Sequence, residues 1–226
     1  MFKEITFTND SVVYYSIIFI LICCLFLTIG PTIDLYVSGL FYYGDSQFSL
    51  QSYYFISKVF REILLPLILV YILILPIVSR YIKIEKIFFG YNFSLKEIVF
   101  IWAAQVITVL IFVNLILKNI WGRARPGDVI QLGGEESFTP WYELSSACTS
   151  NCSFVSGDAS VGFSIITLYF ITKKNYFAYL AIVLGFLLGF IRILAGGHFL
   201  SDILFAGFFI IFLNFVIFKF YQKRYE

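Results

Sequence analysis

The chain has 226 residues, of which 60% are apolar and only 13% are charged, with a formal net charge of +2. Soluble globular domains average roughly 45–50% apolar and about 25% charged residues, so the composition argues against a soluble protein. The small net charge argues against a nucleic-acid partner. Long apolar runs, rather than overall composition, indicate a membrane protein.

Six apolar runs predict six transmembrane helices, at about residues 12–30, 63–78, 98–117, 156–171, 176–195 and 201–218. Pro31 follows the first run without a small-residue cleavage site, which favours an uncleaved helix over a signal peptide. The aromatic-rich residues 31–60 suit an interfacial loop or a surface-lying helix, and residues 118–155 form a long polar loop. We expect an all-α integral membrane protein in which residues 1–226 form a single domain, a six-transmembrane-helix bundle.

The Lys and Arg residues outside the apolar runs predict the topology. Six spans place both termini on one side. With the N-terminus inside, ten of the sixteen Lys and Arg residues are cytoplasmic. This bias predicts cytoplasmic N- and C-termini. Four of the six exceptions lie in two short outer segments: Lys118, Arg123, Arg125 and Arg192. Lys and Arg residues are disfavoured on the outer face by the positive-inside rule. Their presence in these two segments therefore indicates a function there.

The first outer segment reads Lys118-Asn-Ile-Trp-Gly-Arg-Ala-Arg-Pro126. Its three cations directly follow an apolar span, where they could simply reach to the membrane interface. Alternatively they bind an anion, since the planar guanidinium of Arg is a bidentate phosphate ligand.

The second outer segment, Ser156-Gly157-Asp158, stands at the expected start of a helix. Free backbone N–H groups and a hydroxyl at such a position form an anion site. The alternative is that Ser156 or Asp158 merely caps the helix.

The third outer segment, residues 192–202, contains His198, the only histidine of the chain. Asp202 follows at i+4, so both side chains would share one helix face. The carboxylate could hold Nδ1–H of the ring and present Nε2 as a nucleophile. A zinc site is not expected, because there is no second histidine and the cysteines lie elsewhere. The three segments together predict a phosphate site with a nucleophile.

These segments resemble, in order, the three-part signature of the type 2 phosphatidic acid phosphatase (PAP2) superfamily. Lys118, six residues and Arg125-Pro126 match its first motif fully. Its Pro-Ser-Gly-His motif reads Val-Ser-Gly-Asp158 here. Its third motif, Ser-Arg, five residues, His, three residues, Asp, is matched by Arg192, His198 and Asp202, with Ile in place of Ser. The resemblance covers about residues 95–220 and agrees with six helices.

The resemblance implies a role for each matched residue. His198 would attack phosphorus and become a phosphohistidine, and Asp202 would orient it. The residues that would hold the phosphoryl oxygens are Lys118, Arg125, Arg192, Ser156 and Gly157, with Arg123 as a further candidate. No metal or other cofactor is implied, because fixed cations would stabilise the transition-state charge. Asp158 stands where the histidine of the family protonates the leaving group, and it could do so only when it is itself protonated.

A narrower resemblance is to the lipid A 4'-phosphatase branch. It rests on residues 122–126, 151–160 and 196–202, and members of this branch also carry Asp in the second motif. It implies removal of the 4'-phosphate of lipid A at the periplasmic face of a Gram-negative inner membrane. The expected partner is therefore a lipid substrate, and the oligomeric state is not predicted.

Two other readings stay open. If Asp158 is a poor acid, the enzyme needs a good leaving group. A phosphate, with a second pKa of about 6, is such a group, which favours undecaprenyl diphosphate as the substrate. Phosphatidylglycerophosphate is a further alternative substrate. Alternatively, Asp158 and Ile191 mark a non-catalytic member that binds anionic lipid. Cys148 and Cys152 lie four apart in the outer loop, where an oxidising periplasm would allow either a disulfide or two free thiols.

Overall fold

The computed structural model describes residues 93–225, 23–45 and 47–50, together with Ile17, Ile20, Leu21, Ile74 and Ile77. All regular elements within this part of the chain are helices, and only isolated bridges occur besides them. The fold is therefore all-helical over the described residues, as the sequence predicts. Most of the second predicted span lies outside them, as do residues 12–16, 18, 19 and 22 of the first.

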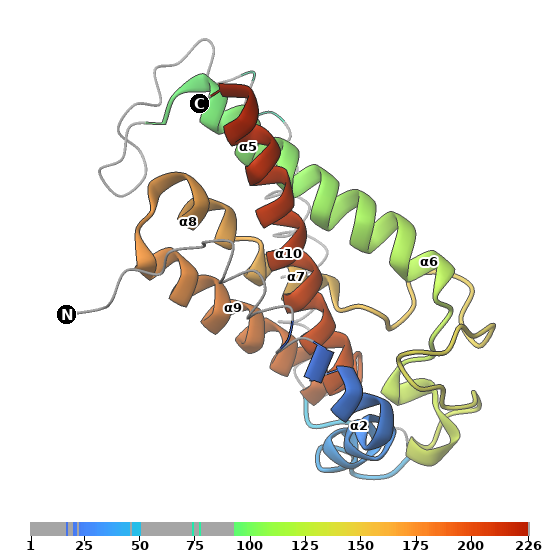
Figure 1. Ribbon diagram of the computed structural model, residues 1–226. Coiled ribbons are helices and arrows are strands. Elements are labelled where there is room, and N and C mark those ends of the chain that lie inside the picture. Colours follow the sequence, from blue (N-terminus) through green and yellow to red (C-terminus); the bar gives the residue numbers. More distant parts are fainter. Residues whose placement is uncertain are drawn as a thin grey trace.

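Three described helices are long and apolar enough to cross a membrane. The first runs over Leu95–Ile120 and joins α5 (Leu95–Gln105), the π-helical η3 (Val106–Leu117) and α6 (Lys118–Ile120). The others are α9 (Asn175–Leu194) and α10 (Leu200–Tyr225). At about 1.5 Å per residue, the 20 residues of α9 match a hydrocarbon core about 30 Å thick. All three correspond to predicted spans (Figure 1).

Local signals explain where the first long helix begins. Ser94 accepts a hydrogen bond from the backbone N–H of Glu97 at 3.4 Å, and Glu97 Oε2 accepts from the backbone N–H of Ser94 at 2.7 Å. This reciprocal capping box satisfies two donors that a helix start would leave unpaired. The helix therefore begins three residues before the apolar run predicted from 98.

The fourth predicted span is two short helices rather than one. α7 (Gly157–Phe163) and α8 (Ile166–Thr172) are separated at Ser164. Ser164 Oγ donates to the carbonyl of Val161, and Thr167 Oγ1 donates to the carbonyl of Ser164, both at 2.7 Å. Such bonds compete with the helical ladder. Together the two helices cover residues 157–172, close to the predicted 156–171, but they do not form the single continuous helix that the sequence predicts.

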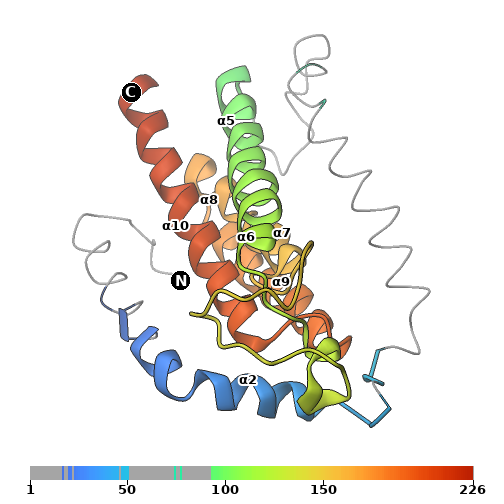
Figure 2. The same cartoon turned by 90° about the vertical axis from the view of Figure 1, so that its right-hand side faces the viewer.

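α2 (Gly30–Gly39) lies across one end of the bundle, crosswise to α10 (Figure 2). Pro31 occupies the first turn, where its missing N–H has no helical partner to lose. Asp34 and Ser38, one turn apart, are fully buried, whereas Tyr36 is 67% exposed. Polar side chains are buried here and an aromatic one is exposed, the reverse of a soluble helix. This pattern suits a helix with lipid on one side and a polar site on the other. It agrees with the surface-lying helix that residues 31–60 could form.

Glycines let the helices near the site approach closely. A Cβ at Gly162 of α7 would lie 2.6 Å from the backbone nitrogen of Gly185 in α9. A Cβ at Gly189, one turn further along α9, would lie 2.5 Å from Cγ2 of Ile203 in α10. Small residues four apart are a common means of close helix packing in membranes.

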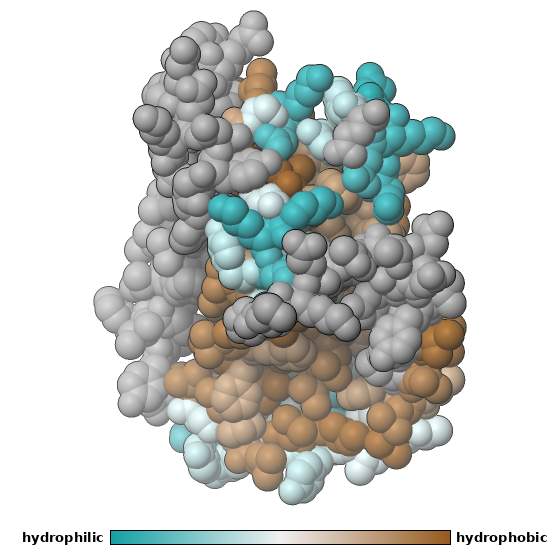
Figure 3. Space-filling view, turned by 60° about the vertical axis from the view of Figure 1, so that its left-hand side comes forward, coloured by the Kyte–Doolittle hydropathy of each residue, from teal (hydrophilic) through white to brown (hydrophobic). Residues whose placement is uncertain are grey.

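Lipid-facing side chains on the outside of the bundle are apolar. Val183 and Leu187 of α9 are 61% and 50% exposed. Figure 3 shows such side chains as a broad brown belt below a hydrophilic upper end. The loop of residues 121–156 folds over the end that carries α2 (Figure 2).

Candidate active site

His198 lies in the short link between α9 and α10. Gly196 has a φ of +65°, a left-handed conformation that glycine adopts without strain, so the chain can turn from one helix into the next. The His198 side chain is buried, and its Nδ1 lies 3.6 Å from Oδ2 of Asp202. That distance is longer than a hydrogen bond, and catalytic contacts of this kind often tighten only when substrate binds.

The surroundings of His198 favour its neutral ring. Burial lowers the pKa of His198 to about 4, and the nearby Lys118 and Arg192 cations act in the same direction, against the opposing effect of Asp202. At neutral pH the ring therefore carries a lone pair. A neutral imidazole is the form that can act as a nucleophile.

Asp202 is held by several donors at once. Oδ2 accepts from the backbone N–H of Phe199 at 2.8 Å and from the hydroxyl of Ser153. Oδ1 accepts from Nη1 of Arg123 at 2.6 Å. These bonds fix the carboxylate beside His198, within one turn of helix α10.

Arg123 has a different environment from the one expected of a phosphate ligand. Its side chain is fully buried. Nε donates to the carbonyl of Thr139 at 2.9 Å, Nη1 to Ser201 and Asp202, and Nη2 to Asp34 at 2.8 Å. The protein itself uses these N–H groups. We therefore place Arg123 in the support of Asp202 and not among the residues that contact phosphate.

Asp34 of α2 was not identified from the sequence. Its carboxylate accepts from Nη2 of Arg123 and from both the backbone N–H and the hydroxyl of Ser201. A lone acid shortly after an apolar run looks like an ordinary interfacial charge. The only available signal is that Asp34 and Ser38 occur one turn apart in an otherwise apolar and aromatic stretch.

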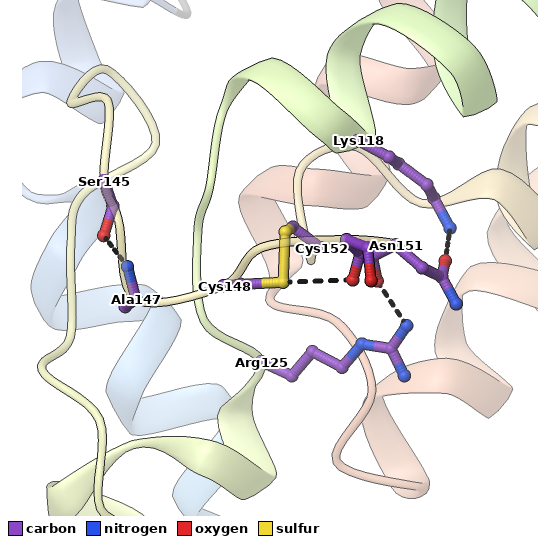
Figure 4. The surroundings of a disulfide bond; sticks show 8 residues. Lys118, Arg125, Ser145, Ala147, Cys148, Asn151 and Cys152 are labelled. Atoms are coloured by element: carbon purple, nitrogen blue, oxygen red, sulfur yellow. Dashed lines mark hydrogen bonds between the residues drawn. A yellow bond between two sulfur atoms is a disulfide. The ribbon is translucent and has the colours of Figure 1, made fainter.

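Lys118 and Arg125 converge on one residue of the loop of residues 121–156, Asn151 (Figure 4). Lys118 Nζ donates to Oδ1 of Asn151 at 3.1 Å, and Arg125 Nη2 donates to its backbone carbonyl at 2.6 Å. Cys148 and Cys152 form a disulfide that encloses Asn151. Asn151 of the disulfide loop therefore binds both Lys118 and Arg125 of the first segment.

The start of α7 reaches the same cations. A Cβ at Gly157 would lie 3.2 Å from Lys118 Nζ, so glycine permits this approach. Ser156 caps α7, accepting from the backbone N–H of Ala159 at 3.4 Å. Its own O–H stays available, because a hydroxyl can accept and donate together. Asp158 Oδ2 lies 3.1 Å from Nε of Arg192.

The sequence matches the family model described as the PAP2 superfamily over residues 99–226. The chain belongs to the PAP2 superfamily. It is 32% identical over 227 residues to a "Lipid A 4'-phosphatase" of Francisella tularensis subsp. novicida (strain U112), covering 94% of this chain and 98% of that protein. Two proteins with the same description, from Rhizobium etli and Rhizobium leguminosarum, are 39% and 38% identical over 103 and 97 residues. These matches cover 44% and 42% of this chain, and 40% and 42% of the relatives.

No solved structure matches the chain significantly. The predicted superfamily is confirmed, and with it the predicted enzyme class, a phosphatase. In this PAP2 protein the three signature segments meet at one end of the long helices. The second segment touches the first through Gly157 and Lys118, and the third through Asp158 and Arg192.

Proposed function

We propose that the protein removes the 4'-phosphate of lipid A at the periplasmic face of a Gram-negative inner membrane. The observation that carries the chemistry is a buried His198 whose Nδ1 lies 3.6 Å from Oδ2 of Asp202, with Lys118 and Arg192 close enough to affect its pKa. The substrate assignment rests on the relative from Francisella, which matches along nearly its whole length. Apolar helices support a lipid substrate that reaches the site from the bilayer.

In the first step of the proposed reaction, Nε2 of His198 attacks phosphorus. The bond from phosphorus to the sugar oxygen breaks, and its electron pair leaves with that oxygen. Asp158 gives the leaving oxygen a proton. Positive charge develops on the ring as the phosphohistidine forms, and the Asp202 carboxylate near Nδ1 stabilises it.

In the second step water attacks the phosphohistidine and Asp158 takes up a proton from it. Inorganic phosphate leaves, and His198 returns to its neutral form. Throughout, Lys118, Arg125 and Arg192 neutralise the phosphoryl oxygens, with the Ser156 hydroxyl and the backbone N–H of Gly157 as further donors. Fixed positive groups of this kind are the main source of catalysis in phosphoryl transfer.

A diphosphate lipid such as undecaprenyl diphosphate is the second candidate substrate. Asp158 Oδ2 lies against Nε of Arg192, and a carboxylate held by a cation cannot protonate a sugar oxygen. A phosphate leaving group, with a second pKa of about 6, needs less help. With lipid A, the incoming phosphate dianion competes with Asp158 for Arg192, which frees the Asp158 side chain to act on the sugar oxygen.

The test is phosphate release by purified protein from lipid A and from undecaprenyl diphosphate. We expect release from lipid A, and we expect His198→Ala to abolish it while Gln131→Ala, an exposed change in the loop of residues 121–156, leaves it intact. An acid-labile phosphoryl label should appear on the wild type but not on His198→Ala. Release that continues in His198→Ala would overturn the nucleophile, and an unchanged phosphate pattern in the lipid A of expressing cells would overturn the substrate.

A further inference from the structure

A row of three buried charged side chains leads from helix α2 to the nucleophile. Asp34 Oδ2 accepts from Arg123 Nη2 at 2.8 Å, and Arg123 Nη1 donates to Asp202 Oδ1 at 2.6 Å. The other oxygen of Asp202 faces Nδ1 of His198. None of the three charged side chains in the row has any exposed surface. Buried charges are costly unless they are paired, so this arrangement needs an explanation.

Asp34 also fixes the beginning of α10. Its Oδ1 accepts from the backbone N–H of Ser201 at 2.9 Å, and its Oδ2 accepts from the Ser201 hydroxyl at 2.6 Å. Ser201 Oγ in turn accepts from Arg123 Nη1 at 2.8 Å. We call Asp34, Arg123, Ser201 and Asp202 the Asp34 network. It ties α2 to the helix turn that carries Asp202.

The charges of the network matter for the proposed reaction. Arg123 and Asp202 alone would make a neutral pair, with little negative charge left to stabilise a histidine that becomes positive. Asp34 adds a second carboxylate, so the network as a whole carries one negative charge. Burial and the nearby Asp202 raise the pKa of Asp34, and Arg123 and Ser201 oppose this. All three groups that reach the Asp34 carboxylate donate to it, which suits its ionised form.

We propose that Asp34 is a positioning residue for His198: it neutralises Arg123, so that Asp202 faces the nucleophile as an uncompensated anion. This inference rests on the proposed function, in which His198 carries positive charge as the phosphohistidine forms. Asp34 lies outside residues 99–226, the part that matches the family model. An N-terminal segment beyond the shared superfamily region therefore completes the surroundings of the nucleophile.

The deciding experiment compares Asp34→Asn with the double variant Asp34→Asn/Arg123→Gln. We expect Asp34→Asn to lower kcat on lipid A by about 10- to 100-fold, the range found for outer partners of metal-bound histidines, with KM little changed. The double variant should be faster than Asp34→Asn, since loss of the Arg123 charge releases the Asp202 anion. If Asp34 were only structural, two substitutions would harm the enzyme at least as much as one.

A control lies on the same face of α2. Ser38 is buried one turn after Asp34, and Ser38→Ala should leave kcat unchanged. If Asp34→Asn alone fails to fold, Arg123→Gln is compared with the double variant. With Arg123 neutral, the charge of Asp34 is no longer needed, so the two rates should agree within a few-fold. A double variant much slower than Arg123→Gln would overturn the proposal.

One readout does not depend on the substrate. His198 is the only histidine, so a protein with a histidine-free tag gives a single pair of ring nitrogen resonances. We expect the wild type at neutral pH to hold its proton on Nδ1, facing Asp202, and Asp34→Asn to shift the proton toward Nε2. Unchanged ring nitrogens and unchanged kcat in Asp34→Asn overturn the inference. Absence of phosphate release by the wild type overturns the proposed function instead, and the ring nitrogens still test Asp34.

Discussion

His198 must stay neutral to act as a nucleophile, and its pKa decides the pH range in which it does so. Burial lowers the pKa of His198 to about 4, whereas an unfolded chain would have a histidine pKa of about 6.5. The folded protein therefore binds fewer protons than the unfolded one between these values. His198 therefore contributes to the free energy of unfolding above about pH 6.5, and this contribution is lost as the pH falls toward 4.

We predict that the ring of His198 stays neutral from pH 8 down to about 5. The measurement is the carbon resonance of the single histidine in protein without a histidine tag, followed against pH. The same protein unfolded in denaturant serves as the control and should titrate near its usual value of about 6.5. A folded-state midpoint near that value would show that the ring is more hydrated than its surroundings indicate.

Asp158 should matter most when the leaving group is poor. General acid catalysis contributes about 10²- to 10⁴-fold, so Asp158→Asn should slow release from lipid A within this range. An aryl phosphate needs little protonation of its leaving oxygen, and its hydrolysis should slow far less. Asp128 is an exposed acid of the loop of residues 121–156, so Asp128→Asn is the matched control and should change neither rate. Equal losses on both substrates would assign Asp158 an electrostatic role through Arg192.

At the level of segments, the disulfide loop should affect the affinity of Lys118 and Arg125 for phosphate. Without the Cys148–Cys152 bond, Asn151 would no longer be held against Lys118 and Arg125. We predict that the double variant Cys148→Ser/Cys152→Ser raises KM for lipid A about fivefold, from about 1 kcal/mol for one hydrogen bond, with a smaller effect on kcat.

A reductant gives the same comparison without mutation. It should raise KM of the wild type and leave the double variant unchanged. Cys23 and Cys24 are free thiols far from this loop in the sequence, and their replacement by Ser is the control. A wild type whose KM is unaffected by full reduction would show that the loop keeps its shape without the bond.

The sequence predicted the long apolar helices, although not their exact ends. The long helices over Leu95–Ile120, Asn175–Leu194 and Leu200–Tyr225 agree with apolar runs, because the bilayer sets their length. The break between α7 and α8 was missed. It depends on local hydroxyl bonds of Ser164 and Thr167, which an apolar window does not register.

The site was predictable where its residues lie at fixed spacing along one helix. His198 and Asp202, four apart, are such a pair. Asp34 and Arg123 are 89 positions apart and meet only because α2 packs across the end of α10. Pairing at that separation depends on tertiary packing, so Arg123 was grouped with the phosphate ligands beside it in the sequence.

For the whole molecule, the remaining question is which side of the membrane the site faces. The signature segments and α2 lie at one end of the long helices, and the C-terminus lies at the other (Figure 1). The C-terminal end carries Lys219, Lys223 and Arg224. With this end in the cytoplasm, the positive-inside rule is satisfied, and the site faces the periplasm.

We predict that a cysteine at Leu144, a 67% exposed residue of the loop of residues 121–156, reacts with a membrane-impermeant maleimide in intact cells whose outer membrane is permeabilised. A cysteine at Lys223, near the C-terminus, should react only after the inner membrane is broken. Both changes are made with Cys23 and Cys24 replaced by Ser, and the disulfide keeps Cys148 and Cys152 unreactive. The reverse labelling pattern would put the site in the cytoplasm. Lipid A phosphates exposed to the periplasm would then be out of its reach, so the proposed substrate would be lost even if the histidine chemistry held.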